Sequence, residues 1–127
     1  QYFKHVLFED ALVDFLGLVS VFPKAHGTDT SQLNQSLLMS LKARSLSRPQ
    51  LKIDADDVTC SHGSTTGQLD DEQLFYMRSR GLSQLESMSI LLCSFLAEIC
   101  DFILVEEVRQ DVNALIRKWV DGYVELV

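Results

Sequence analysis

The sequence predicts a β + α fold, in which a strand-rich part comes first and a helical part follows. Up to residue 68 the apolar residues alternate or gather in short runs rich in Val, Leu and Phe, which is the pattern of strands. From residue 69 onward they recur every three or four positions, as on one face of a helix. We therefore predict two domains, strands in residues 1–68 and about three helices in residues 69–127.

The length and composition fit one small globular piece. The chain has 127 residues, of which 46% are hydrophobic and 23% charged, and these are ordinary values. Because it begins without Met or a leader pattern, we expect a piece cut from a longer protein. The net charge of −7 argues against a nucleic-acid surface, which needs clustered Lys and Arg. We expect a cytoplasmic protein, with the plastid stroma as the alternative.

The first half offers four or five short strands with polar connections. Residues 2–8 and 12–22 form the first two apolar runs, and residues 24–35 are rich in turn-favouring Gly, Asp, Ser and Asn. Residues 37–43 and 51–58 are again apolar or alternating. The connections are too short for crossover helices. A solenoid would remove the open sheet edges by stacking coil on coil, while a sandwich stays possible from periodicity alone.

The helical half begins with a strong capping pattern. Asp70 is a good N-cap with Gln73 three residues later, so we predict a helix that begins at Asp71. Gly81 follows a basic turn and favours the left-handed conformation that ends a helix. The first helix is therefore predicted to be short, beginning at Asp71 and ending at Gly81.

Two further helices follow from spacing. Ser83 and Glu86 form a capping box, and the apolar stripe after them predicts a helix through Ile103. A third amphipathic run covers residues 108–123. These helices can pack on one another and on the end of the strand region.

The segment 88–105 is apolar enough to suggest a membrane span. Glu98 and Asp101 lie inside it, and central carboxylates are costly in lipid, so we predict a buried core helix. Cys93 and Cys100 lie in the same segment and are predicted to be buried, reduced thiols, since the three cysteines of the chain form no CxxC pair.

The pattern with chemical potential is a cysteine and a histidine two residues apart. In an extended segment such residues point to one face, so the thiol of Cys60 and the imidazole of His62 can share one metal ion or substrate. Sulfur and imidazole suit iron, zinc and copper(I). Structural zinc takes four ligands, so a full site needs Asp56, Asp57, His26 or a second chain.

Other interpretations of this pair stay open from the residues alone. Cys60 can be structural beside a surface His62, and the nearby acids can form a solvated turn. A metal-dependent hydrolase on a solenoid would use the pair with Asp57. The sequence has no GxSxG, P-loop or dinucleotide-binding turn, which argues against nucleotide use. The basic residues Lys42, Arg44 and Arg48 are predicted to lie in an exposed loop.

A longer pattern around the pair resembles a known family. The run PQLKIDADDVTCSHG at 49–63, with LFY at 74–76 and RSRG at 78–81, is similar to the C-terminal part of the SufD branch of the SufB/SufD family. These proteins are scaffold subunits of the SUF iron–sulfur cluster assembly system. The SufB branch typically has Glu-His-Glu where this chain has Cys-Ser-His-Gly, so the resemblance is to SufD.

The resemblance implies a fold and partners. The fold is the last coils of a right-handed parallel β-helix followed by a small C-terminal helical domain. The partners are SufB, paired through the β-helix, and the ATPase SufC, docked on the helical domain. The resemblance places SufC near Arg78, Arg80, Gly81 and Leu82. The isolated chain could also pair with itself.

The resemblance also assigns the site. His62 is the main ligand of a nascent, transient iron–sulfur cluster shared with a cysteine of SufB, and Cys60 assists or orders the segment. No residue is catalytic, and the isolated chain is expected to hold no cluster. A purely structural role, in which SufB supplies all the chemistry, is the remaining alternative.

Overall fold

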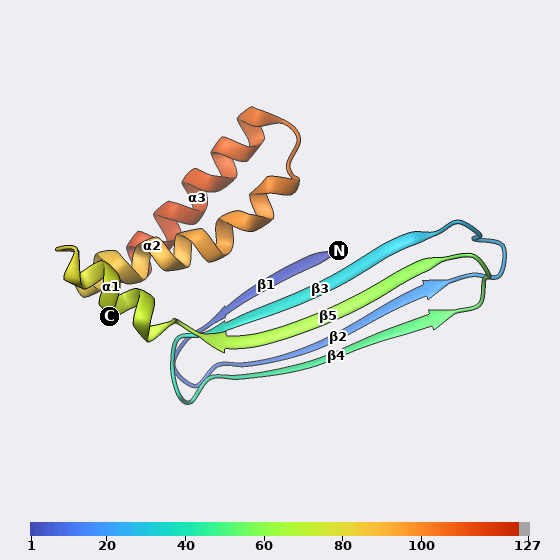
Figure 1. The fold of residues 1–127 in the computed structure, drawn as a ribbon, viewed down its shortest axis with the longest axis horizontal. Helices are drawn as coiled ribbons and strands as arrows, with labels where there is room; N and C mark the ends of the chain where they lie inside the picture. The colour runs from blue at the N-terminus through green and yellow to red at the C-terminus, as the bar shows by residue number, and fades with distance from the viewer. Residues whose placement is uncertain (125–127) are drawn as a thin grey trace. The chain divides into compact units, whose positions relative to one another are not determined.

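The computed structural model describes residues 1–124, which separate into two compact units. One covers Gln1–Gln68 and the other begins at Leu69. The described strands lie in the first unit and the described helices in the second (Figure 1). The predicted mixture of strands followed by helices is thus confirmed.

The strand unit consists of two parallel sheets. The strands are β1 (Tyr2–Leu7), β2 (Leu12–Val21), β3 (Asp29–Leu38), β4 (Arg44–Ile53) and β5 (Thr59–Gln68). One sheet has the order β1-β3-β5 and the other pairs β2 with β4 (Figure 1). The chain therefore passes from one sheet to the other after every strand.

Neighbouring strands pair without a change of register, so residues stack in columns. Tyr2 lies opposite Leu33, and Leu33 lies opposite Gly63. In the second sheet Leu12 lies opposite Arg44. Because parallel partners share a face of the sheet, each column presents its side chains either to the interior or to solvent.

The interior between the sheets is partly polar. Asn34 is fully buried and its Nδ2 donates a hydrogen bond to Ser47 Oγ on the facing sheet, at 3.0 Å. Two residues along each strand, Ser45 Oγ donates to Ser36 Oγ at 2.8 Å. Such bonds are needed because a buried polar group without a partner costs about 1–3 kcal/mol.

This polar interior explains why several predicted strand boundaries are wrong. Residues 24–35 were expected to be a polar turn, but β3 begins at Asp29, because its polar side chains face a polar interior. The apolar run 37–43 contributes only the end of β3, and only the first three residues of 51–58 belong to β4. Hydrophobic runs mark strands poorly where the core itself contains amides and hydroxyls.

The first helix agrees with its capping pattern. It is α1 (Asp71–Ser79), and the side chain of Asp70 accepts hydrogen bonds from the backbone N–H groups of Glu72 and Gln73. Gly81 has a φ of 97°, the left-handed conformation predicted for the residue after the helix. Both ends of α1 are therefore determined by local sequence.

Two longer helices complete the helical unit. They are α2 (Gln84–Ala97) and α3 (Glu106–Val124), and the capping box of Ser83 and Glu86 is present at the start of α2. The helices pack side by side (Figure 1), with Leu92 and Val120 fully buried. No helix in residues 1–124 is long and apolar enough to cross a membrane.

The predicted continuous core helix through Ile103 is wrong. The chain leaves α2 at Ala97 and forms a 3₁₀ turn, η1 (Glu98–Phe102). In a 3₁₀ turn residues three apart lie on one side, and the carboxylates of Glu98 and Asp101 are both exposed while Cys100 is 1% exposed. Cys93 is only half-buried, so burial is confirmed for Cys100 alone of these two thiols.

Candidate functional site

The strand β5 carries both chemically active residues of the candidate site. Cys60 lies opposite Thr30 of β3 and His62 lies opposite Gln32, so the two side chains share the face that points toward the other sheet. The predicted common face is thus confirmed. Cys60 is half-buried and His62 is exposed, which leaves the imidazole accessible to a partner or a metal ion.

His62 is accessible because the two sheets differ in size. Its sheet has three strands, whereas the facing sheet in the described residues has only two. β5 lies at the edge of its sheet. In the facing sheet β4 is the last strand, and no further strand of residues 1–124 lies opposite β5. An edge of this kind presents unpaired backbone groups to another chain.

A buried glutamine lies beside His62. Gln32 is 2% exposed, and its Nε2 donates to Gln1 Oε1 at 2.8 Å. Its Oε1 is buried and has no hydrogen-bond partner among residues 1–124. Space for this amide comes from Gly17 on the facing sheet, where a Cβ would lie 2.3 Å from Gln32 Oε1. Sequence reasoning missed both residues, since neither belongs to a recognisable motif.

The other predicted metal donors are held elsewhere in the unit. His26 Nδ1 donates to the carbonyl oxygen of Asp56 at 3.0 Å, and Gly27 N donates to that of Asp57 at 2.9 Å. These bonds join two turns, and Asp57 adopts a left-handed φ of 55°. Among residues 1–124 no three His, Cys, Asp or Glu side chains gather closely enough to hold a metal ion. Within this part of the chain, Cys60 and His62 are an incomplete donor set.

The predicted basic loop is mostly a strand. Arg44 and Arg48 lie on β4, and only Lys42 lies in the preceding turn. The guanidinium of Arg48 forms an ion pair with Asp14 on β2. The hydrogen bond and the charge of Asp14 raise the pKa of Arg48. This exposed pair is a surface feature of the second sheet.

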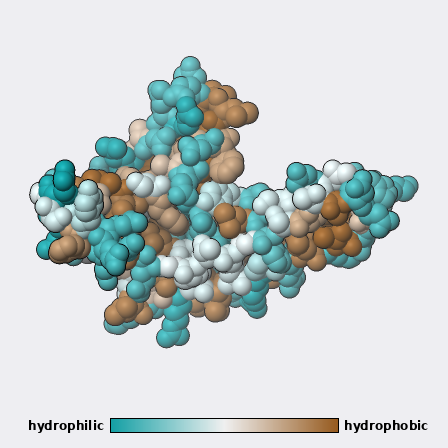
Figure 2. Space-filling view, viewed as in Figure 1, coloured by the Kyte–Doolittle hydropathy of each residue, from teal (hydrophilic) through white to brown (hydrophobic). Residues whose placement is uncertain are grey.

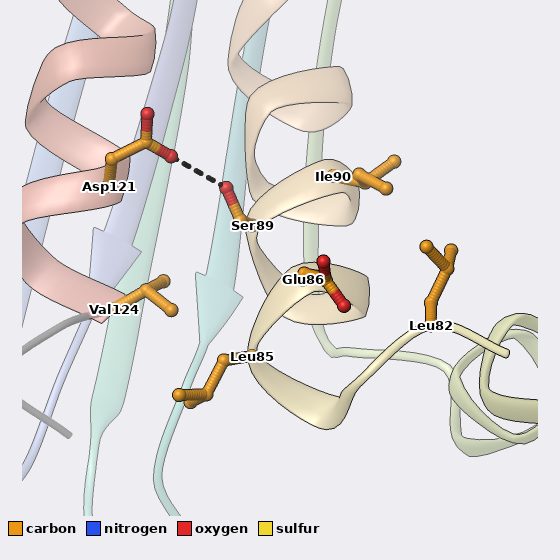
Figure 3. Close-up of a pocket in the computed structure, with 7 residues that line it drawn as sticks. All are labelled: Leu82, Leu85, Glu86, Ser89, Ile90, Asp121 and Val124. Atoms are coloured by element: carbon orange, nitrogen blue, oxygen red, sulfur yellow. Dashed lines mark hydrogen bonds between the residues drawn. The ribbon is translucent and has the colours of Figure 1, made fainter.

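The helical unit contains an open groove of about 430 Å³. Leucine, isoleucine and valine side chains form most of its wall, and Figure 3 shows Leu85 of α2 and Val124 of α3 on the sides of their helices that face each other. Ser89 Oγ donates to Asp121 Oδ1 at 3.0 Å across the two helices. The lining residues are Leu82, Leu85, Glu86, Ser89, Ile90, Asp121 and Val124.

Of the residues expected to bind a partner, Leu82 lines this groove, and Arg78, Arg80 and Gly81 precede it in the chain. Gly81 makes the turn before Leu82. Arg78 and Arg80 are exposed before the turn. The side chain and backbone of Ser83 lower the pKa of Glu86, so that the groove carries a carboxylate at neutral pH.

Exposed aromatic side chains were not predicted as site residues. Phe75 is 74% exposed and Tyr76 is 63% exposed, and α1 has no buried residue. The signal available in the sequence was the pair of consecutive aromatic residues, because α1 is too short and too polar to bury both of them by itself. Figure 2 shows apolar patches among polar side chains on the surface.

The chain is similar to known assembly proteins. Residues 1–95 match the family described as SUF system FeS cluster assembly, SufBD core domain. The chain is 39% identical over 122 residues to the iron-sulfur cluster assembly protein SufD of Escherichia coli, covering 96% of this chain and 29% of that protein.

A second relative is an iron-sulfur cluster assembly SufBD family protein of Synechocystis, 43% identical over 103 residues, with 81% of this chain and 23% of that protein covered. The chain thus spans less than a third of each of these relatives. The family match covers most of the chain and includes the strand that carries Cys60 and His62. The chain therefore belongs to the SufBD family of SUF iron–sulfur cluster assembly proteins, as the resemblance in its sequence predicted.

Proposed function

We propose that this chain is part of a SufD-like scaffold that pairs with SufB, binds the ATPase SufC and catalyses no reaction of its own. The observation that carries the proposal is the position of His62. It is an exposed imidazole on an edge strand, beside one thiol, and residues 1–124 do not bring enough further donors to it to complete a site. A second subunit that covers this edge would supply the missing ligands.

The strand unit fits the end of a right-handed parallel β-helix. The chain alternates between two sheets, and each strand returns in register beside the strand two before it. In-register return is what stacks successive coils in a solenoid. The open edges of β4 and β5 then form the face for SufB.

The cargo of the site is a nascent iron–sulfur cluster. A neutral imidazole nitrogen of His62 binds iron, and a cysteine of SufB shares the cluster, which suits the soft and borderline ligands that iron accepts. Cys60, half-buried on the same face, orders the segment or adds a thiolate. The cluster is transient, and the isolated chain holds none.

Cluster loading of the SufB complex tests the role of His62. His62→Ala should abolish loading while pairing with SufB and SufC persists. Ser61→Ala is the matched control, because Ser61 is exposed on the same strand but lies on the opposite face. Loading of the His62→Ala complex at the wild-type level would refute the assignment.

Metal content separates the proposed function from its alternatives. Iron or zinc is measured in the isolated chain and in the SufB complex, each with wild-type His62 and with His62→Ala. Metal that appears only in the complex and depends on His62 supports a shared site. Metal in the complex that does not depend on His62 would indicate a purely structural role for this chain.

The groove of the helical unit is the proposed site for SufC. Its apolar wall begins at Leu82, directly after the turn formed by Gly81, and Ile90 extends it along α2. A few well-packed side chains near the centre of an interface carry most of its binding energy. Exposed Phe75 and Tyr76 on α1 provide further apolar contact area.

A pair of matched variants tests the groove. Ile90→Asp should weaken SufC binding about 10-fold to 100-fold, since an unpaired carboxylate would be buried at the contact. Leu104→Asp is the control, because Leu104 is 97% exposed and does not line the groove. Titration calorimetry with purified SufC gives both affinities. Equal affinities for the two variants would place the SufC contact elsewhere.

A further inference from the structure

We propose that Gln32 is a positioning residue for His62, accepting a hydrogen bond from one ring N–H so that the other ring nitrogen keeps its lone pair for a ligand. The inference rests on the proposed role of His62 as an iron ligand. It concerns an interior residue of the neighbouring strand, outside the Cys60-His62 motif. It involves no change in protonation of the imidazole.

The register places the two residues side by side. Gln32 of β3 is the pairing partner of His62 on β5, so both side chains leave the same face of the sheet. Adjacent strands are about 4.8 Å apart. A glutamine amide and an imidazole at this spacing are within reach of one hydrogen bond after rotation of the histidine side chain about its own torsions.

The nitrogen of the Gln32 amide already has a partner. Its Nε2 points along the column toward Gln1, to whose Oε1 it donates at 2.8 Å. The oxygen is therefore the end of the amide that still has no partner among residues 1–124, and it lies next to Gly17 of the facing sheet, where an added Cβ would be 2.3 Å away. His62 occupies the column on the β5 side of Gln32.

The carbonyl oxygen is available for this bond. Gln32 Oε1 is buried and lacks a hydrogen-bond partner within residues 1–124. The neighbouring interior amide of Asn34 uses one of its two N–H groups for Ser47 Oγ. On the facing sheet Gly17 offers no side chain, and any Cβ there would collide with the oxygen. A buried acceptor without a donor costs about 1–3 kcal/mol, which a ring N–H of His62 would recover.

The chemical consequence is a fixed tautomer. When one nitrogen of a neutral imidazole donates to a carbonyl oxygen, the other has no proton and presents its lone pair. Histidine ligands of metal ions commonly have such an outer partner, which also holds the ring orientation. Gln32 would therefore prepare His62 before any ligand arrives.

Nitrogen NMR of the histidine rings tests the proposal in the purified chain at a pH of about 9, above the ordinary histidine pKa. His62 should show one dominant tautomer in the wild type. Gln32→Met keeps the side-chain length but removes the acceptor, and should shift the tautomer ratio about fivefold or more toward a mixture. Gln32→Glu keeps an acceptor and should restore the wild-type ratio. Gln50→Met, at an exposed glutamine on β4, is the control.

An unchanged tautomer ratio in Gln32→Met would overturn the proposal. A crystal structure of the unsubstituted protein is an independent measurement that does not depend on variant folding. A distance from a His62 ring nitrogen to Gln32 Oε1 of about 3.2 Å or less supports the bond, and a distance beyond about 3.5 Å contradicts it. Failure of the proposed function is seen separately, as cluster loading that does not depend on His62.

Discussion

Gln32 and His62 are register partners on neighbouring parallel strands, one buried at 2% exposure and the other open to solvent. The pair connects the candidate site with the interior of the strand unit, because Gln32 is an interior residue and His62 is a site residue. Gly17 is part of the same arrangement, since it leaves room for the glutamine amide. Interior substitutions are therefore expected to have measurable effects on the strand unit.

Gly17→Ala should destabilise the protein by about 1–3 kcal/mol, because the new methyl group would meet Gln32 Oε1 at 2.3 Å. Urea unfolding measures the change. Gly67→Ala is the control, since Gly67 also lies in a strand but no atom of residues 1–124 would lie within 4 Å of the added Cβ. A loss of stability equal to that of the control would mean that the Gln32 side chain moves aside at little cost.

Ser47→Ala should cost about 1–3 kcal/mol of unfolding free energy, because the buried Nδ2 of Asn34 would lose its acceptor. Thermal or urea unfolding gives the value. Ser20→Ala changes an exposed serine of β2 and should stay within about 0.5 kcal/mol of the wild type. If both variants behave alike, the hydrogen bond between the sheets contributes nothing measurable.

Glu86 should contribute to stability in a pH-dependent way. Hydrogen bonds from the side chain and then the backbone of Ser83 lower its pKa in the folded state, so the unfolded state takes up a proton first as pH falls. The contribution is thus fully present above the unfolded glutamate pKa of about 4.3 and is lost as pH falls through the lowered folded value.

Glu86→Gln tests this dependence, because glutamine keeps the capping geometry without the charge. The difference in unfolding free energy between the wild type and the variant should be largest above about pH 5 and shrink toward acid pH. A difference that stays constant from pH 3 to pH 7 would show that the charge of Glu86 has no part in the cap.

The cysteines should differ in their reaction with a maleimide. Burial raises the pKa of the Cys93 thiol, so its reactive thiolate is scarce at neutral pH and its labelling should accelerate as pH rises. Cys100 is 1% exposed and should react only as the helical unit unfolds. Mass spectrometry of the labelled peptides measures each rate, with the denatured chain as the control. Rapid labelling of Cys100 in the native state would contradict its burial.

The helical half was predictable because its determinants are local. The N-cap of Asp70, the capping box of Ser83 and the left-handed Gly81 each act within four residues, so the sequence pattern and the observed ends agree. The end of α2 was not predictable in this way. The C-cap residue is Glu98, which is not a residue type that signals a helix end, and the apolar stripe continues past the point where the backbone becomes 3₁₀.

The strand half shows the opposite case. Strand β3 looks like a loop in the sequence, because Asn34 and Gln32 are polar, and only the facing Ser47 makes their burial possible. The bonding of such groups joins residues that are distant along the chain. Periodicity in a single segment therefore carries no information about it.

By itself the sequence determined the family, the order of strands before helices, and the common face of Cys60 and His62, since these follow from motifs and from the two-residue period of a strand. Only the tertiary structure decided that His26, Asp56 and Asp57 stay apart from that pair. It also decided that Gln32 lies beside His62. The physical reason is that parallel register, which no local pattern encodes, brings together residues from successive passes of the chain.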